Sequence, residues 1–470
     1  MGSPTAKTNL FRVLIFVLSS GLLLVAETLP PVSFNVKARI EPAAGTIAVQ
    51  ATIDIPLAAK PQDFQFRLYE TFVIRRLLVD GKEASFSERA IEPSPMTPAA
   101  KAVTVTLPPV LSRDRIQLDI AYQGQLKDIP EFGTFPDQKL AQDDQINSRM
   151  VELAGYSSWY PVFASEESVQ LQQLELSLPQ GWTSICSGEK LDEQIKDGRA
   201  ITRWSAPPDL DIVIVASPNF KKKTVRQSGV NIEVYYTQVP EEFIAQEGRQ
   251  IADVIKFDTD HLGETSIPGG TVRHVYSPKH KGQGRADFAR AGLIVTSEGR
   301  TLDSLAQDPK FSLFQSIAHE IGHFWWNFGA GQGDWINEAF AEYFSAVAVQ
   351  KISSEQEFRS VLADYRKQVG ELPAAAPSLS EVPLLNDQSD FVIRYYKGSL
   401  MLNSLRETLG DEQFFQACRD FFQLYQGKPT GTTEFRSFWD NKMGDRKNAL
   451  DAWLDSKGGL PGREQKREGY

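Results

Sequence analysis

Residues 316–328, SIAHEIGHFWWNF, place two histidines and a glutamate at a spacing that could do chemistry. The chain has only five histidines in 470 residues, and His319 and His323 are four positions apart. On a helix they lie one turn apart on the same face, where both imidazoles can reach one metal ion. Glu320 is rotated by about 100° from His319, so it can touch a water on that ion without binding the ion itself.

This arrangement is typical of zinc hydrolysis. Zinc lowers the pKa of a water molecule, and a carboxylate placed like that of Glu320 takes the proton as the water attacks a carbonyl carbon. The alternative is an ordinary helix that carries H-E-x-x-H by accident. So few histidines make such an accident rare in one chain.

A catalytic zinc ion needs a third protein ligand, and WINEAFAEYF, residues 335–344, offers two glutamates. The glycines of residues 328–334 must end the first helix, and Asp334 suits the N-cap of a second one. Glu338 then lies in the first turn of that helix. If the two helices pack antiparallel, Glu338 can reach the ion held by the two histidines.

Glu342 lies one turn beyond Glu338 on the same face, where it would hold a histidine N–H instead of the metal. We expect Asn337, beside the third ligand, to support the site in a similarly indirect way. The alternative is that both glutamates are exposed on an amphipathic helix. Their aromatic neighbours Phe340, Tyr343 and Phe344 speak against that alternative.

Alternation of apolar and polar residues dominates the first half of the chain and predicts many short strands. It is clearest over residues 32–40, 47–55, 103–107, 116–120 and 174–178. Asp80-Gly81 is a hairpin signal. We therefore expect an all-β domain over residues 27–222, shaped as a β-sandwich or a saddle-like sheet.

Helical periodicity replaces this alternation after about residue 225. The chain as a whole is therefore expected to be a multidomain α+β protein, with a second domain over residues 223–462 and a tail over 463–470. Strands are predicted in this domain at 271–276 and 292–296. Helices are predicted at residues 241–261, 311–328, 335–352, 355–369, 396–409, 412–425 and 433–442.

The N-terminus suggests export. Lys7 and Arg12 precede an uninterrupted apolar run, Val13 to Ala26. The run is short for a bilayer span of about 20 residues, and it suits a secretory signal. Residues 1–26 are predicted to be a signal peptide, with an uncleaved membrane anchor through residues 13–26 as the alternative. The mature protein would be secreted, periplasmic or held on the outer face of the membrane.

Charge and cysteine content exclude two classes of protein. A formal net charge of -10 argues against a nucleic-acid partner. Two cysteines, Cys186 and Cys418, are too few for a disulfide-stapled scaffold. The sequence does not decide whether these two pair.

HEIGH followed by WINEAFAEY resembles the gluzincin metallopeptidases of the aminopeptidase N type, whose signature is H-E-x-x-H and a downstream N-E-G/A-F-A-E. GYSSWYPVF at 155–163 and IRYYKGSLML at 393–402 are similar to two further segments of that family, in the same order. The resemblance implies a thermolysin-like, mainly helical catalytic domain after the β-domain. It also implies one Zn²⁺ per chain and a peptide or protein substrate.

The resemblance assigns roles residue by residue. It implies that His319, His323 and Glu338 bind zinc and that Glu320 is the general base. Tyr395, two residues before a lysine, matches the tyrosine whose hydroxyl stabilises the oxyanion of the tetrahedral intermediate. Tyr396 beside it leaves the register open.

The sequence departs from the family at two places. The stretch between His323 and Glu338 is shorter than is usual in the family. The family's G-x-M-E-N motif, whose glutamate binds the free α-amine of the substrate, is replaced by ADFARAGLIV at 286–295. Ala289 stands in the place of the glutamate and Arg290 in that of the asparagine. Asp287 shares a strand face with Ala289 and could substitute as the amine anchor, whereas Arg290 could favour a substrate carboxylate.

The leading hypothesis is an exported zinc metallopeptidase that is not a strict aminopeptidase, with exopeptidase and endopeptidase action both open. A peptidase-like binding or scaffold protein that keeps zinc but has little or no turnover is the alternative. A third hypothesis is hydrolysis of a non-peptide amide or ester by the same site.

Overall fold

A computed structural model describes residues 30–57, 63–92, 99–107, 114–126, 132–135, 138–140, 144–163, 168–227, 229–279, 287–328, 333–383 and 388–462. The apolar run 13–26 and the tail 463–470, about which the sequence makes predictions, lie outside these residues. Among the described residues, no helix combines the length and the apolar character needed to cross a membrane.

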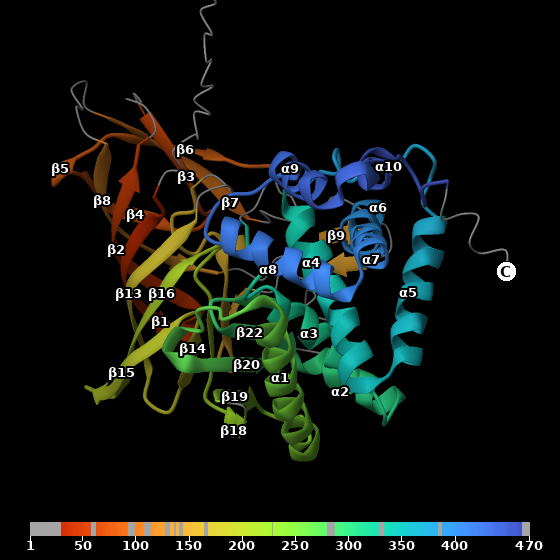
Figure 1. Cartoon of the computed structure of the whole chain (residues 1–470). Helices are drawn as coiled ribbons and strands as arrows, with labels where there is room; N and C mark the ends of the chain where they lie inside the picture. Colours follow the sequence, from red (N-terminus) through yellow and green to blue (C-terminus); the bar gives the residue numbers. More distant parts are fainter. Residues whose placement is uncertain are drawn as a thin grey trace, which may run out of the picture.

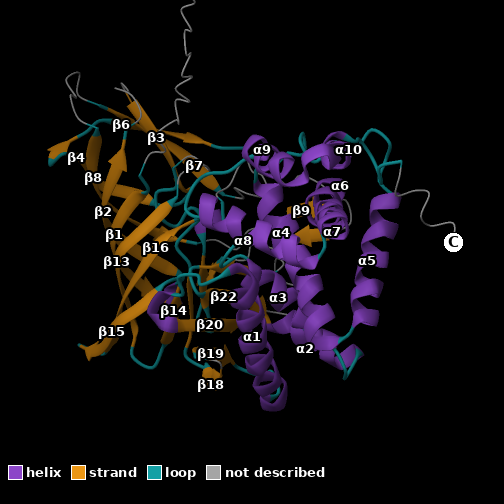
Figure 2. Cartoon of the chain, in the orientation of Figure 1, coloured by secondary structure: helices purple, strands orange, loops and turns teal. Residues whose placement is uncertain are grey.

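The N-terminal part of the chain is built of β-sheets, which confirms the expectation from its alternating pattern (Figures 1 and 2). The largest sheet has eight strands in the order β15-β16-β13-β1-β2-β8-β4-β5, and smaller sheets join β3-β7-β6, β11-β12-β17-β14 and β10-β9. The strands are β1 Val32–Glu41, β2 Thr46–Pro56, β3 Asp63–Tyr69, β4 Val73–Val79, β5 Lys82–Glu83, β6 Phe86–Ala90, β7 Ala100–Thr106, β8 Arg115–Gln125, β9 Phe132–Phe135, β10 Gln138–Leu140, β11 Gln145–Ile146, β12 Val151–Leu153, β13 Val169–Pro179, β14 Thr183–Cys186, β15 Glu189–Lys196, β16 Arg199–Asp209 and β17 Ile214–Ser217.

A local turn signal in this domain is also confirmed. Asp80 and Gly81 join β4 to β5 in a tight hairpin, and both adopt positive φ angles of 49° and 77°. Glycine takes this conformation at no steric cost, and aspartate tolerates it better than most residues.

The second domain begins with a five-stranded mixed sheet in the order β18-β19-β20-β22-β21 and becomes helical (Figure 2). Because β18 starts at Lys221, the expected boundary after residue 222 falls inside this strand. The strands are β18 Lys221–Gln227, β19 Val230–Tyr236, β20 Thr271–Ser277, β21 Phe288–Arg290 and β22 Leu293–Ser297. The helices are α1 Glu241–Leu262, α2 Glu298–Gln307, α3 Phe314–Gly322, α4 Asp334–Ala348, α5 Glu355–Gly370, α6 Gln388–Phe391, α7 Gly398–Leu409, α8 Asp411–Tyr425, α9 Thr432–Met443 and α10 Lys447–Asp455.

Three predicted helix boundaries are wrong, and each has a local cause. The helix expected to reach residue 328 ends at Gly322, because the chain tightens there and turns Trp325 and Trp326 into the core. Asp334 is the first residue of α4 instead of its N-cap, and it pairs with Arg394. The helix expected from residue 396 begins as a π-helical turn, Val392–Lys397, that runs into α7.

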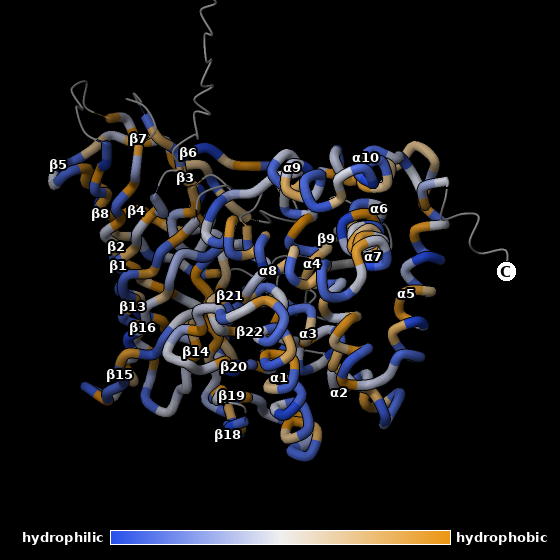
Figure 3. The backbone as a smooth tube through the Cα atoms, viewed as in Figure 1, coloured by the Kyte–Doolittle hydropathy of each residue, from blue (hydrophilic) through white to orange (hydrophobic). Residues whose placement is uncertain are grey.

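Two apolar cores hold the chain together, and Figure 3 shows hydrophobic stretches alternating with hydrophilic ones along the strands and helices that build them. One core fills the second domain between its sheet and helices. The other fills the β-domain and includes Val275, Leu293 and Val295 from the opposite face of the five-stranded sheet. This shared packing fixes the sheet, and thus the edge strand β21, against the β-domain.

Close helix packing around α4 depends on two glycines. A Cβ atom on Gly322 of α3 would lie 3.0 Å from the Cα atom of Ala341, and one on Gly398 of α7 would lie 2.5 Å from the Cβ atom of Ala339. Ala341 and Ala339 can move away from these added atoms only if the backbone of α4 moves as well. These small residues therefore let α3 and α7 approach the backbone of α4, the helix that carries Glu338.

We predict that Gly398→Ala lowers the free energy of unfolding by about 1–3 kcal/mol, because the added methyl group overpacks against Ala339. Gly370→Ala is the matched control, since a Cβ atom there meets nothing within 4 Å, and alanine otherwise favours a helix by about 0.5–1 kcal/mol. Urea unfolding of both variants measures the difference. Equal midpoints for the two variants would contradict this account of the packing.

Candidate active site

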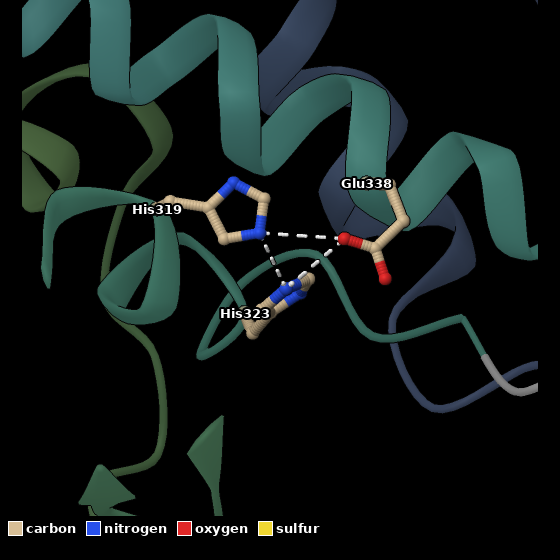
Figure 4. Close-up of side chains that lie close together, drawn as sticks. All are labelled: His319, His323 and Glu338. Carbon is tan, nitrogen blue, oxygen red and sulfur yellow. Dashed lines mark hydrogen bonds and ion pairs between the residues drawn. The ribbon is translucent and has the colours of Figure 1, made fainter. Parts of the chain in front are cut away.

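The structure brings His319, His323 and Glu338 together, although α3 and α4 are separated in sequence (Figure 4). The Nε2 atoms of the two histidines are 3.2 Å apart. Glu338 points one carboxylate oxygen, Oε2, at both of them, at 3.3 Å from His319 Nε2 and 3.5 Å from His323 Nε2. Three potential ligand atoms thus face a common point at the junction of the two helices.

The other nitrogen of each histidine ring is held by an acceptor. His319 Nδ1 lies 2.7 Å from Glu342 Oε2, and His323 Nδ1 lies 3.2 Å from the carbonyl oxygen of Trp326. Since both partners accept hydrogen bonds, each Nδ1 carries the proton. With Nδ1 held in this way, each Nε2 is the nitrogen that can give its lone pair to a metal ion at the common point.

Glu342 is itself fixed from the side away from the histidine. The Tyr365 hydroxyl donates a hydrogen bond to Glu342 Oε1, and Gln315 Nε2 reaches the same oxygen at 3.4 Å and the tyrosine oxygen at 2.7 Å. Glu342 therefore orients His319 by holding its Nδ1–H, as predicted from its position one turn after Glu338. Tyr365 and Gln315 extend this support to α5 and to the first turn of α3.

The site fits a zinc ion. Glu338 Oε2 is buried and has no hydrogen-bond partner among the described residues, and a buried carboxylate oxygen without a partner is costly. Burial alone would raise the pKa of Glu338, but His323 and His319 outweigh it and hold that pKa well below its usual range. Two imidazole nitrogens and one ionised carboxylate oxygen are a donor set that suits catalytic zinc.

Glu320, which follows His319 in the sequence, is buried and only 6% exposed. Burial raises its pKa to about 7, and the neighbouring histidines only partly offset this effect. A carboxylate with a pKa near neutrality can take up a proton and release it again at the pH of most enzymes. The sequence-predicted general base thus has a suitable environment.

Tyr395, rather than Tyr396, faces the histidines. Its ring stacks on that of His319 with centroids 5.4 Å apart and planes at 7°, whereas Tyr396 stacks on Tyr365 on α5. Burial, with the negative charge of Glu338 next, raises the pKa of Tyr395 well above its ordinary value. The hydroxyl therefore stays protonated at neutral pH and can donate a hydrogen bond.

Asn337 is hydrogen-bonded to the segment that follows α3 and to the first turn of α4. Its Oδ1 accepts a hydrogen bond of 2.8 Å from the backbone N–H of Phe328, and its Nδ2 lies 3.3 Å from Asp334 Oδ1. Asn337 thus joins the segment after α3 to the start of α4. Its support of the site is through the backbone.

The three residues predicted at the substrate side lie on or beside the edge strand β21, and both charged ones are paired. Asp287 is buried, forms an ion pair with Arg300 and accepts a hydrogen bond of 2.7 Å from Ser316. Ala289 is buried in the apolar core. Arg290 donates from Nε to Asp211 Oδ1 at 2.5 Å, so its charge is opposed by a carboxylate of the β-domain.

Sequence reasoning missed Arg394, which precedes Tyr395. Its guanidinium pairs with Asp334 and lies 3.8 Å from the second oxygen of Glu338, Oε1. A signal was present, since a charged residue directly before the matched tyrosine is out of place in an otherwise buried segment. Its partners lie about sixty positions away in the sequence and could not be deduced from it.

A sheet-and-helix domain with two helix-borne histidines, a glutamate ligand on the next helix and a preceding β-domain defines the two-domain zinc-peptidase architecture. Residues 291–454 match the Peptidase family M1 domain. The chain is 22% identical over 416 residues to aminopeptidase N of Lactococcus lactis subsp. lactis, covering 82% of this chain and 46% of that protein. It is 22% identical over 274 residues to the alanine/arginine aminopeptidase of Saccharomyces cerevisiae, covering 55% of this chain and 31% of that protein.

Solved structures share the fold. A mutant M1 zinc metallopeptidase from Deinococcus radiodurans, bound to a Tyr-Ser-Ala substrate, matches with a TM-score of 0.69 and 16% identity, over 93% of this chain and 96% of that chain. This chain spans less than half the length of the two curated relatives above. The family match over residues 291–454, the relatives and the shared fold support an aminopeptidase N-type gluzincin of the M1 family.

We predict that Glu342→Gln weakens zinc binding by about 10- to 100-fold, because the carboxylate that holds His319 Nδ1 loses its charge. Competition with a chromophoric zinc chelator measures the affinity. Glu371→Gln, at an exposed glutamate just after α5, is the control and should leave it unchanged. Equal affinities for both variants would show that Glu342 does not support the metal.

Proposed function

We propose that this protein hydrolyses peptide bonds with the help of one zinc ion. The convergence of His319, His323 and Glu338 carries the proposal. A zinc ion held there supplies the Lewis acidity that brings the pKa of water to about 7. The peptide bound to the structural relative from Deinococcus radiodurans supports a peptide substrate.

Two side chains of the chain itself would carry out the proton and charge chemistry. Glu320 takes the proton from the attacking water and passes it to the leaving amine, a role for which a pKa of about 7 is suitable. The Tyr395 hydroxyl donates a hydrogen bond to the oxygen on which negative charge develops. Its stacking on His319 fixes its ring beside the ligands.

We predict that Glu320→Gln lowers kcat/KM by about 10²–10⁴-fold, because the amide cannot take up the proton. Zinc content should be unchanged, since the proposed ligands are His319, His323 and Glu338 and do not include Glu320. Tyr395→Phe should lower kcat by about 10²–10³-fold, whereas the control Tyr396→Phe, which alters a ring stacked on Tyr365, should not. Full turnover by zinc-loaded Glu320→Gln would overturn the mechanism.

A binding or scaffold role with zinc retained is the second candidate, and the absence of a carboxylate at Ala289 favours it. An alanine cannot pair with the ammonium group of a substrate. Against this candidate stand Glu320 and Tyr395, because a structural zinc site needs neither. If the zinc-loaded wild-type protein cleaves no peptide, that result would favour this role or the hydrolysis of a non-peptide amide or ester.

We further propose that cleavage does not require a free α-amine. Ala289 on the edge strand β21 has only a buried methyl group, which cannot pair with a substrate amine. The nearest acidic residue on this segment, Asp287, already has Arg300 on one oxygen and Ser316 on the other. An extended peptide can still bind to the edge strand through backbone hydrogen bonds, which do not depend on its N-terminus.

This proposal predicts similar kcat/KM values for matched peptides with free and acetylated N-termini. Mass spectrometry of the products gives the rate and the bond that is cut. Cleavage of only the free peptides would contradict the proposal and point to Asp287 as the anchor. In that case Asp287→Asn should abolish the preference for the free amine.

A further inference from the structure

Arg394 is a buried cation at the zinc site that the proposed mechanism does not use. It sits on the π-helical turn Val392–Lys397, directly before Tyr395, and its side chain is 4% exposed. Its guanidinium pairs with Asp334 in the first turn of α4 and lies 3.8 Å from Glu338 Oε1. Within the described residues its Nε has no hydrogen-bond acceptor.

Burying this cation with an unsatisfied donor costs stability, which favours a functional reason for its place. The two oxygens of Glu338 have different surroundings. Oε2 faces the Nε2 atoms of the two histidines, and Oε1 faces the guanidinium (Figure 4 shows the two oxygens pointing apart). A cation beside Oε1 draws that oxygen away from the histidines and takes up part of the carboxylate charge.

Arg394 also joins three segments of the site. Asp334, its ion-pair partner, lies 3.3 Å from Asn337 Nδ2, and Asn337 accepts a hydrogen bond from the backbone of Phe328 after α3. The next residue, Tyr395, stacks on His319. One side chain therefore connects the tyrosine-bearing turn with the start of the helix that carries Glu338.

We propose that Arg394 is a positioning residue that makes Glu338 bind the metal through one oxygen and fixes Tyr395 relative to that ligand. The inference rests on the proposed zinc site. Without Arg394, no cation holds Oε1 away from the point that Oε2 and the two histidines share. The tyrosine-bearing turn would at the same time lose its tie to α4.

The test compares Arg394→Met and Arg394→Lys with Arg406→Met in the full chain. Arg406 is a matched control because it is also buried and ion-paired, with Asp411, but it lies on α7 and contacts no proposed ligand. Both methionine variants should lose thermal stability. Only Arg394→Met should change zinc affinity in a chelator competition, and it should bind zinc more tightly because a cation is removed and a second carboxylate oxygen is freed. Arg394→Lys should reverse part of that change.

Cobalt replacement gives a readout that loss of stability alone would not change. The visible absorption of the Co²⁺-loaded Arg394→Met protein should differ from that of the wild type, since the coordination of Glu338 changes, while Arg406→Met should match the wild type. Unchanged zinc affinity and cobalt spectrum in Arg394→Met would overturn the inference. A wild-type protein that binds no zinc would instead overturn the proposed function. Failure of the proposed function can therefore be told apart from failure of the inference about Arg394.

Discussion

The contact between α3 and α4 is the constraint on which the rest of the site depends. His319 of α3, His323 at the C-cap of that helix and Glu338 of α4 can meet within 3.5 Å only if the helix backbones nearly touch. Gly322 and Ala341 allow this, because any larger side chain at the glycine would strike the Cα atom of Ala341. The shared apolar core then keeps the two helices at this separation.

Burial of so many ionisable groups in one place requires that each has a partner. Glu342 has the His319 ring and Tyr365, Asp334 has Arg394 and Asn337, and Asp287 has Arg300 and Ser316. Glu338 Oε2 has no hydrogen-bond partner within the described part of the chain and faces the two histidines at 3.3 and 3.5 Å. A bound cation would compensate the burial of this charged oxygen.

Local patterns in the sequence predicted most of the elements and the spacing of the two histidines, because both depend on short-range order. Period-two alternation identified the strands of the β-domain, and the four-residue spacing of His319 and His323 placed both on one helix face. Helix ends were less predictable, since tertiary packing of Trp325 and Trp326 decides where α3 stops. The partners of Arg394 and Arg290 are long-range contacts to Asp334 and Asp211, and no local pattern identifies such pairs.

The proposed metal ligands and the residues predicted at the substrate side lie on different elements. The ligands come from α3 and α4, whose positions are set by helix packing, whereas Ala289 and Arg290 lie on the edge strand β21, paired only with β22. Arg290 is neutralised by Asp211, which also accepts a hydrogen bond from the backbone of Gly155. A substitution on this strand therefore alters the contact with the β-domain, and it can also reach α3, because Ser316 of that helix donates a hydrogen bond to the neighbouring Asp287.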